Sequence, residues 1–178
     1  MKTQLGELVA RRSTLKANMP ASKLMERICK FLKEQAMCTL ATSLGDTPRA
    51  TLLEYFSEGT TLYINGDPGM KLKNIQANPK VCIAIYNMVH PDWLSDDWKR
   101  IKGARVTGEA KVLDLEDPES IRARKEIIRW QPFAEALGRD EPPPGSQVIR
   151  VAAREIEYYE FALMLEGYIG RQLWQAPK

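Results

Sequence analysis

The sequence predicts a mainly β protein with some α (α+β), built on an antiparallel sheet of six to seven strands that closes on itself under flanking helices. Residues 37–86 give the clearest evidence, because short apolar runs rich in β-forming residues alternate there with Gly, Asp and Pro turn signals. Turns this short favour antiparallel neighbours, and the few helical stretches suit the ends of such a sheet. We expect one domain over residues 1–178, with an N-terminal arm over 1–21 and a packed C-terminal tail over 164–178.

The first half of the chain reads as a helix, three strands, a short helix and a fourth strand. Residues 22–35 have the apolar periodicity of an amphipathic helix. The short helix is predicted to start at Asp67-Pro68, an N-cap residue followed by Pro at the first helical position, and to end at Asn78-Pro79. The four strands are predicted over 37–43, 48–56, 60–65 and 81–86.

The second half alternates strands with a helical stretch and ends in an apolar tail. A helix is predicted to begin at Asp117-Pro118, again an N-cap residue followed by Pro. The other predicted elements are strands over 100–113, 147–153 and 155–163, a second helical piece over 133–137 and a Pro-rich loop over 139–145. The tail carries Tyr168, Leu173 and Trp174 among few charges, so it should pack on its own barrel or on a partner subunit.

Composition excludes several classes of function. The chain has 26 basic and 23 acidic residues, and this net charge of +3 is too balanced to favour nucleic-acid binding. No apolar run approaches about 18 residues, and the N-terminus lacks the apolar core of a secretory signal, so we expect a cytoplasmic protein without a membrane span. Three scattered cysteines show no metal-ligand spacing, so no metal site is predicted. The single histidine, His90, excludes a site that needs several histidines of one chain; it remains open as a solvated loop residue, a proton donor or one axial haem ligand.

Four short motifs follow one another along the predicted strands. They are RATLLE at 49–54, LYIN at 62–65 followed by Lys71 and by Asn-Pro at 78–79, VTGEA at 106–110, and IEYY at 156–159. In this order and at this spacing they resemble the pyridoxamine 5'-phosphate oxidase-like family, the flavin-binding split β-barrels. The resemblance implies a split barrel that binds flavin mononucleotide (FMN) at the interface of a homodimer, with a small-molecule substrate or electron donor.

The resemblance also implies which residues hold the cofactor, although each of them also suits an ordinary surface or core position. Arg49 is expected to bind the flavin phosphate with its planar fork. Lys71 lies in the first turns of the short helix, where free N–H groups favour an anion, and Asn65 precedes that helix. The remaining expected flavin contacts are Ala50, Thr51 and Leu52 along one strand, and Lys102 and Tyr159 on two later strands.

Departures from the family pattern argue against a true pyridoxamine phosphate oxidase. Glu54 stands where family members often carry Lys, Met70 where the oxidases carry Arg, and Gly103 where they carry Gln. The Arg-Leu-His substrate motif is absent after the IEYY strand. We therefore expect an FMN-dependent oxidoreductase that acts on an unidentified small molecule. The alternatives are a haem-binding or haem-handling split barrel, a non-catalytic flavin sensor or storage module, and an enzyme that uses a deazaflavin.

Overall fold

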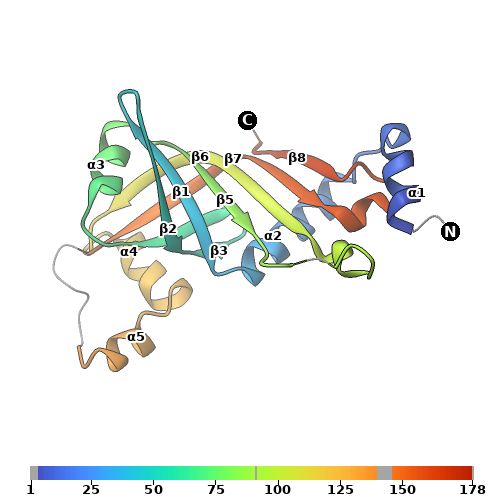
Figure 1. Cartoon of the computed structure of the whole chain (residues 1–178). Coiled ribbons are helices and arrows are strands. Elements are labelled where there is room, and N and C mark those ends of the chain that lie inside the picture. Colours follow the sequence, from blue (N-terminus) through green and yellow to red (C-terminus); the bar gives the residue numbers. More distant parts are fainter. Residues whose placement is uncertain (1–3, 91, 140–145, 178) are drawn as a thin grey trace.

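A computed structural model describes residues 4–90, 92–139 and 146–177 (Figure 1). The described strands form one antiparallel sheet in the order β2-β1-β5-β6-β7-β4-β3, and β8 pairs with β7. The sheet curls into a half-barrel, which confirms the predicted fold class. The strands are β1 Met37–Leu44, β2 Thr47–Glu54, β3 Phe56–Glu58, β4 Thr61–Gly66, β5 Lys80–Tyr86, β6 Lys102–Leu113, β7 Gln147–Glu160 and β8 Arg171–Gln175.

The helices lie around this sheet, and α2 packs into its concave face. The α-helices are α1 Gln4–Arg11, α2 Ala21–Glu34, α3 Met70–Ala77, α4 Pro118–Arg122 and α5 Gln131–Ala136. A π-helical turn, Ala123–Ile127, continues α4, so α4 and α5 form a helical insertion between β6 and β7 (Figure 1). Within the described residues, no helix is long and apolar enough to cross a membrane.

The core is formed by the inward-facing side chains of the central strands, where buried and outward-facing residues alternate. Leu40, Ile83, Val106 and Ile156 stand opposite one another across β1, β5, β6 and β7, and all four are fully buried. They belong to one apolar cluster with the inner face of α2. Burial of each such side chain stabilises the fold by roughly 1.5–3 kcal/mol. The residues between them in sequence face outward, which leaves the other face of the sheet uncovered in a single chain.

Two predicted strand boundaries were wrong, for different reasons. The run 48–56 is two strands, because Tyr55 turns inward, is 2% exposed and donates its hydroxyl to the Leu32 carbonyl at 2.7 Å. The chain thereby crosses from the β2 edge to the β3 edge of the sheet. Conversely, residues 147–160 form the single strand β7, and residues 161–163, predicted as strand, lie in the 3-10 turn Phe161–Met164. The pairing with β6 shifts between Thr107 and Gly108, where Arg154 of β7 has no partner, so a bulge on β7 keeps the strand continuous.

Of the two predicted helix N-caps, Asp67 is not confirmed and Asp117 is. Asp67 does not cap α3, which begins at Met70 after Gly69; the Asp67 carbonyl instead accepts from Lys71. Asp117 does cap α4, since its carboxylate accepts from the Glu119 amide at 2.8 Å and Pro118 takes the first position.

The C-terminal segment packs on its own chain. Strand β8 pairs with residues 155–159 of β7, and Trp174 lies opposite Ile156. Gln172 is 1% exposed and accepts a hydrogen bond from the Met19 amide at 2.9 Å, which ties this segment to the start of α2. The tail is therefore an integral edge of the sheet in this structure.

Candidate functional site

A cavity of about 360 Å³ lies where the two halves of the curled sheet face each other without pairing. Strand β2 is an edge of the sheet and pairs only with β1 among the described strands, yet it approaches β4 closely. The helical insertion covers this gap. The lining residues come from β1 and β2 (Met37, Leu52, Leu53, Glu54), from the end of β4 (Asn65, Asp67), from the insertion (Leu115, Arg124, Trp130, Phe133, Leu137) and from the start of β7 (Ser146, Gln147, Val148).

Lys71 is a buried cation that contacts Asp67, one of the residues that line this cavity. It is 8% exposed, and its ammonium donates to the carbonyl of Asp67 at 2.7 Å. Within the described residues no carboxylate lies within ion-pair distance of it. Lys71 occupies the first turn of α3, where backbone N–H groups lack helical partners. Buried charges are normally paired, and among the described residues Lys71 has only the Asp67 carbonyl for a partner.

A second buried polar group on α3 also lacks a partner, but it is an acceptor and calls for a donor rather than for an anion. Asn74 is 3% exposed, and its amide donates to the Thr42 hydroxyl on β1 at 3.0 Å. Its amide oxygen is buried and has no partner in the described part of the chain. Arg49 on β2 stands opposite Thr42 in the strand register, so both side chains face the same side of the sheet. Arg49 and Lys71 therefore lie on β2 and α3, two elements that both pack on β1, and neither of them is among the residues that line the cavity.

The three residues predicted to lie along a flavin ring occupy the open edge strand β2. Leu52 is 72% exposed and lines the cavity, Ala50 is exposed on the same face, and Thr51 faces inward. An edge strand presents backbone N–H and C=O groups that no neighbouring strand uses. Recognition of a planar ring by main-chain groups is therefore possible at this edge. Asn65, predicted for the phosphate or the ribityl chain, lines the same cavity.

Lys102 and Tyr159 lie at the other end of β7, away from this cavity. The Lys102 ammonium pairs with Glu160 at 3.2 Å and lines a second cavity, of about 560 Å³, beneath α2. Tyr159 packs edge-on against Phe161, with ring centroids 5.4 Å apart, and beneath the Arg171 guanidinium. The structure therefore does not bring the eight predicted cofactor residues together in one chain: Leu52 and Asn65 line the cavity beside β2, whereas Lys102 and Tyr159 line two other cavities on opposite faces of the sheet.

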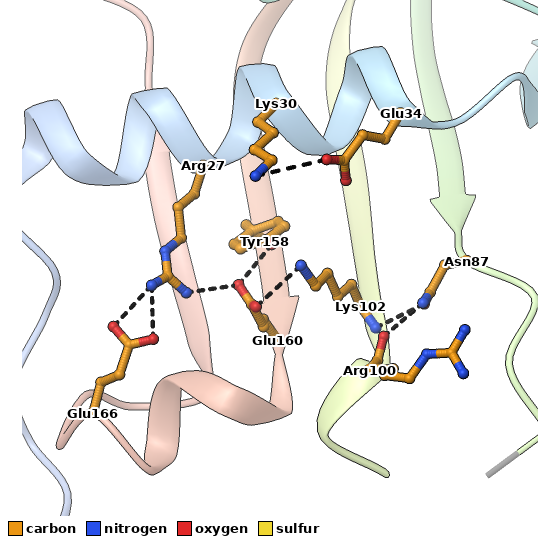
Figure 2. Close-up of polar contacts among 9 residues, drawn as sticks. All are labelled: Arg27, Lys30, Glu34, Asn87, Arg100, Lys102, Tyr158, Glu160 and Glu166. Carbon is orange, nitrogen blue, oxygen red and sulfur yellow. Dashed lines mark hydrogen bonds and ion pairs between the residues drawn. The ribbon is translucent and has the colours of Figure 1, made fainter. Parts of the chain in front are cut away.

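A charged network around Glu160 was not predicted (Figure 2). The Glu160 side chain is 5% exposed and accepts from the Tyr158 hydroxyl at 2.8 Å and from Arg27 on α2 at 3.1 Å. Arg27 also contacts both carboxylate oxygens of Glu166. One signal in the sequence could have revealed this network. Glu160 is an acidic residue two positions after Tyr158, so it faces the same inner side of the strand, and Arg27 is a basic residue beside the buried positions of the predicted amphipathic helix.

Opposite charges and hydrogen bonds within the network offset the cost of burying the Glu160 carboxylate. Burial alone raises the pKa of Glu160, but the hydrogen bond from Tyr158 and the positive charges of Lys102 and Arg27 outweigh it, so the pKa of Glu160 lies below its ordinary value. Burial and the neighbouring Glu160 carboxylate raise the pKa of Tyr158. Every charge in this network has a partner in the chain, which makes it a structural tie between α2 and the sheet.

His90 is exposed on the loop that follows β5. Across residues 4–90, 92–139 and 146–177, no three His, Cys, Asp or Glu side chains come together in a way that could hold a metal ion. Cys38 is buried, and burial raises the pKa of its thiol to about 12, so it behaves as a small core residue.

A model of the pyridoxamine 5'-phosphate oxidase family matches residues 24–160. The chain belongs to this family. The matched range contains the edge strand β2, Lys71 and the helical insertion. No protein with a curated function matches the sequence significantly.

Solved structures show the same fold at low sequence identity. A putative pyridoxamine 5'-phosphate oxidase from Listeria innocua is 24% identical, with a TM-score of 0.58 over 76% of this chain and 97% of that one. A FAD-binding protein from Mesorhizobium loti is 20% identical, with a TM-score of 0.57 over 74% and 88%. A haem-binding protein from Mycobacterium smegmatis is 18% identical, with a TM-score of 0.61 over 89% of this chain and 60% of that one.

Proposed function

We propose that this protein binds FMN and is an oxidoreductase that transfers electrons or hydride between the flavin and a small molecule. The observation that carries the proposal is the buried ammonium of Lys71, which has a backbone carbonyl but no carboxylate for a partner among the described residues. A phosphate group supplies the missing negative charge.

Within this proposal each residue has one task. Lys71 and Arg49 hold the phosphate, and Asn65 contacts the phosphate or the ribityl chain. The backbone of residues 50–52 on the β2 edge receives the ring. The flavin supplies the redox chemistry when it is bound, while the chain provides orientation, phosphate anchoring and exclusion of water.

The proposal includes a homodimer with residues of both subunits at each flavin. Lys102 and Tyr159 lie away from β2 within one chain, so they reach the flavin only if a second copy brings them there. The uncovered face of the sheet suits such a contact, because Met37, Leu52 and Tyr86 are 57%, 72% and 60% exposed on it. Light scattering should give about twice the chain mass of 20.2 kDa. A 20.2 kDa particle at micromolar concentration with flavin still bound would contradict a shared site.

Haem binding is the second candidate, favoured by the haem-binding neighbour of the same fold. It would rest on His90 as an axial ligand, and His90 is exposed on a loop rather than placed in either cavity. No other histidine is present in the chain. The geometry therefore favours flavin, bound either by an enzyme or by a storage or sensor module.

The absorption spectrum of the purified protein, before and after incubation with FMN or haem, tests the proposal. Bands at about 370 and about 450 nm that remain after gel filtration identify a bound flavin. One intense band at about 400 nm identifies haem. Retention of haem with no retention of FMN would overturn the proposed function.

A further inference from the structure

Two carboxylates line the cavity beside β2, and each follows an expected flavin contact by two residues. Glu54 lies two positions after Leu52 on the edge strand β2, so both side chains leave the same face of the sheet. Asp67 lies two positions after Asn65, just beyond the end of β4, and both line the same cavity. A flavin ring that contacts Leu52 and Asn65 therefore lies close to both carboxylates.

Neither carboxylate is neutralised within the described part of the chain. Glu54 and Asp67 are both exposed, and among the described residues no cation lies within ion-pair distance of either carboxylate. Lys71 contacts the backbone carbonyl of Asp67 rather than its carboxylate. The lining also holds one guanidinium, that of Arg124, so two carboxylates and one cation leave the cavity with one negative charge in excess.

The charge of a flavin ring changes when the ring is reduced. The oxidised ring is neutral, and reduction adds two electrons and one proton, which leaves one negative charge on the ring at neutral pH. Like charges repel, most strongly where the ring displaces the water between them. A cavity with an excess carboxylate therefore holds the oxidised ring more tightly than the reduced ring. The phosphate keeps the same charge in both states, so its contacts with Lys71 and Arg49 cancel from this comparison.

We propose that Glu54 and Asp67 make this cavity favour the neutral, oxidised ring, and that they thereby lower the reduction potential of the bound flavin below that of free FMN. The inference rests on the proposed function, because it takes the ring to lie along β2. A lower potential makes the reduced flavin a stronger electron donor, and it makes reduction of the flavin by a weak donor less favourable.

The test compares the affinity of the protein for oxidised and reduced FMN. The ratio is obtained from the reduction potentials of free and bound FMN, measured without oxygen by titration with dithionite against a reference dye. We expect reduced FMN to bind about tenfold more weakly than oxidised FMN, which corresponds to a potential about 30 mV below that of free FMN. A bound potential equal to or above the free value would overturn the inference.

A charge series at one position connects this ratio to a named residue. Glu54→Gln removes one negative charge and Glu54→Lys reverses it, so the preference for oxidised FMN should fall about threefold at each step. Asp67→Asn keeps the backbone carbonyl that Lys71 contacts and should also reduce the preference. Glu26→Gln is the matched control, because this exposed carboxylate lies on α2 and lines the cavity beneath that helix. A ratio that is the same in wild type, Glu54→Lys and Glu26→Gln would contradict the assignment.

A second measurement does not depend on flavin. 9-Aminoacridine and acridine-9-carboxylate share one planar three-ring system, and at neutral pH the first is a cation and the second an anion. Their binding is followed by fluorescence titration in a buffer with inorganic phosphate, which occupies the proposed anion position at Lys71. The cation should bind at least about tenfold more tightly than the anion, and Glu54→Lys should remove most of that preference.

The outcomes separate this inference from the proposed function. If FMN fails to bind but the acridines show the predicted preference and its loss in Glu54→Lys, the cavity selects by charge as inferred and the flavin assignment fails. If FMN binds and its potential is the same in wild type and Glu54→Lys, the flavin assignment stands and the inference is wrong. If FMN does not bind and the acridines do not differ, both are wrong.

Discussion

The polar groups at one end of strand β7 are paired within the chain, whereas several at the other end are not. At the Glu160 end, Arg27, Lys102, Tyr158 and Glu166 all find partners within the chain, and the network joins α2 to the sheet. At the Gln147 end, Lys71 has only a carbonyl for a partner, and Arg124, Trp130 and Asn74 keep buried polar atoms unpaired. The first arrangement stabilises the folded chain by itself. The second leaves N–H groups without acceptors, the Asn74 oxygen without a donor and a buried cation without an anion among the described residues, and the proposed flavin phosphate would supply that anion.

The contrast shows why charge content alone does not identify a site. Both ends combine Arg or Lys with acidic and aromatic residues, and the Glu160 end has the larger cavity. The two ends differ in whether their buried polar groups have hydrogen-bond or ion-pair partners. A fully paired network is stabilised little by a ligand, whereas an unpaired buried cation is stabilised strongly by one. Changes at the Glu160 end should therefore alter stability, and changes at the Gln147 end should alter binding.

Removal of the tail should have the largest effect on stability. Truncation after Leu165 deletes β8, which pairs along β7, together with Glu166, the bidentate partner of Arg27. Tyr168, Ile169 and Trp174 are half-buried, so each contributes part of the roughly 1.5–3 kcal/mol of a fully buried side chain, and with the lost strand pairing we expect the free energy of unfolding in urea to fall by at least about 3 kcal/mol, with a smaller loss of FMN affinity. Truncation after Ala176 is the control and should behave as wild type. A Leu165 truncation that melts like the full chain would show that the tail is dispensable.

Disruption of the network at its centre should have the next largest effect. Glu160→Ala leaves Arg27 and Lys102 without their buried partner; because both cations are about a third exposed, we expect a loss of about 3 kcal/mol, the lower end of the range for broken buried pairs. The exposed pair Arg154–Glu109 supplies the control, and Glu109→Ala should cost at most about 1 kcal/mol. Urea denaturation of both variants measures the difference, and similar losses would contradict the distinction drawn between the two ends.

The acid range offers a smaller test of the same network. The pKa of Glu160 in the folded chain lies below its ordinary value of 4.5, so its stabilising effect is present above about pH 4.5 and is lost as the pH falls through the folded value. The stability difference between wild type and Glu160→Gln should therefore shrink between pH 6 and pH 3. Urea midpoints measured across that range check this, and a difference that grows in acid would reverse the assigned sign.

Most of the fold could be predicted from the sequence because alternation and turn residues are local signals. The alternation in residues 37–43 and 81–86, with turn residues between, predicted the antiparallel curled sheet directly. The errors came from tertiary effects: Tyr55 breaks a strand to reach the Leu32 carbonyl, and a bulge at Arg154 keeps β7 continuous. Local composition does not encode either of these.

The candidate site was only partly predictable for the same reason. Arg49, Asn65 and Lys71 were named from motif positions, but the lack of a carboxylate beside Lys71 is visible only in three dimensions. The Glu160 network was missed because Arg27 and Glu160 are 133 residues apart in the chain. Arg124 and Trp130 belong to a helical stretch whose sequence gives no sign that it closes a cavity against β2.

The most direct test of the central claim is the ratio of affinities for FMN and riboflavin, measured by flavin fluorescence titration. If Lys71 and Arg49 bind the phosphate, wild type prefers FMN by at least about tenfold, and Lys71→Met or Arg49→Ala weakens FMN binding about ten- to a hundredfold with little effect on riboflavin. Lys73→Met, an exposed lysine two residues along the same helix, serves as control and should keep the wild-type ratio. Equal affinity of the wild type for FMN and riboflavin would contradict the account.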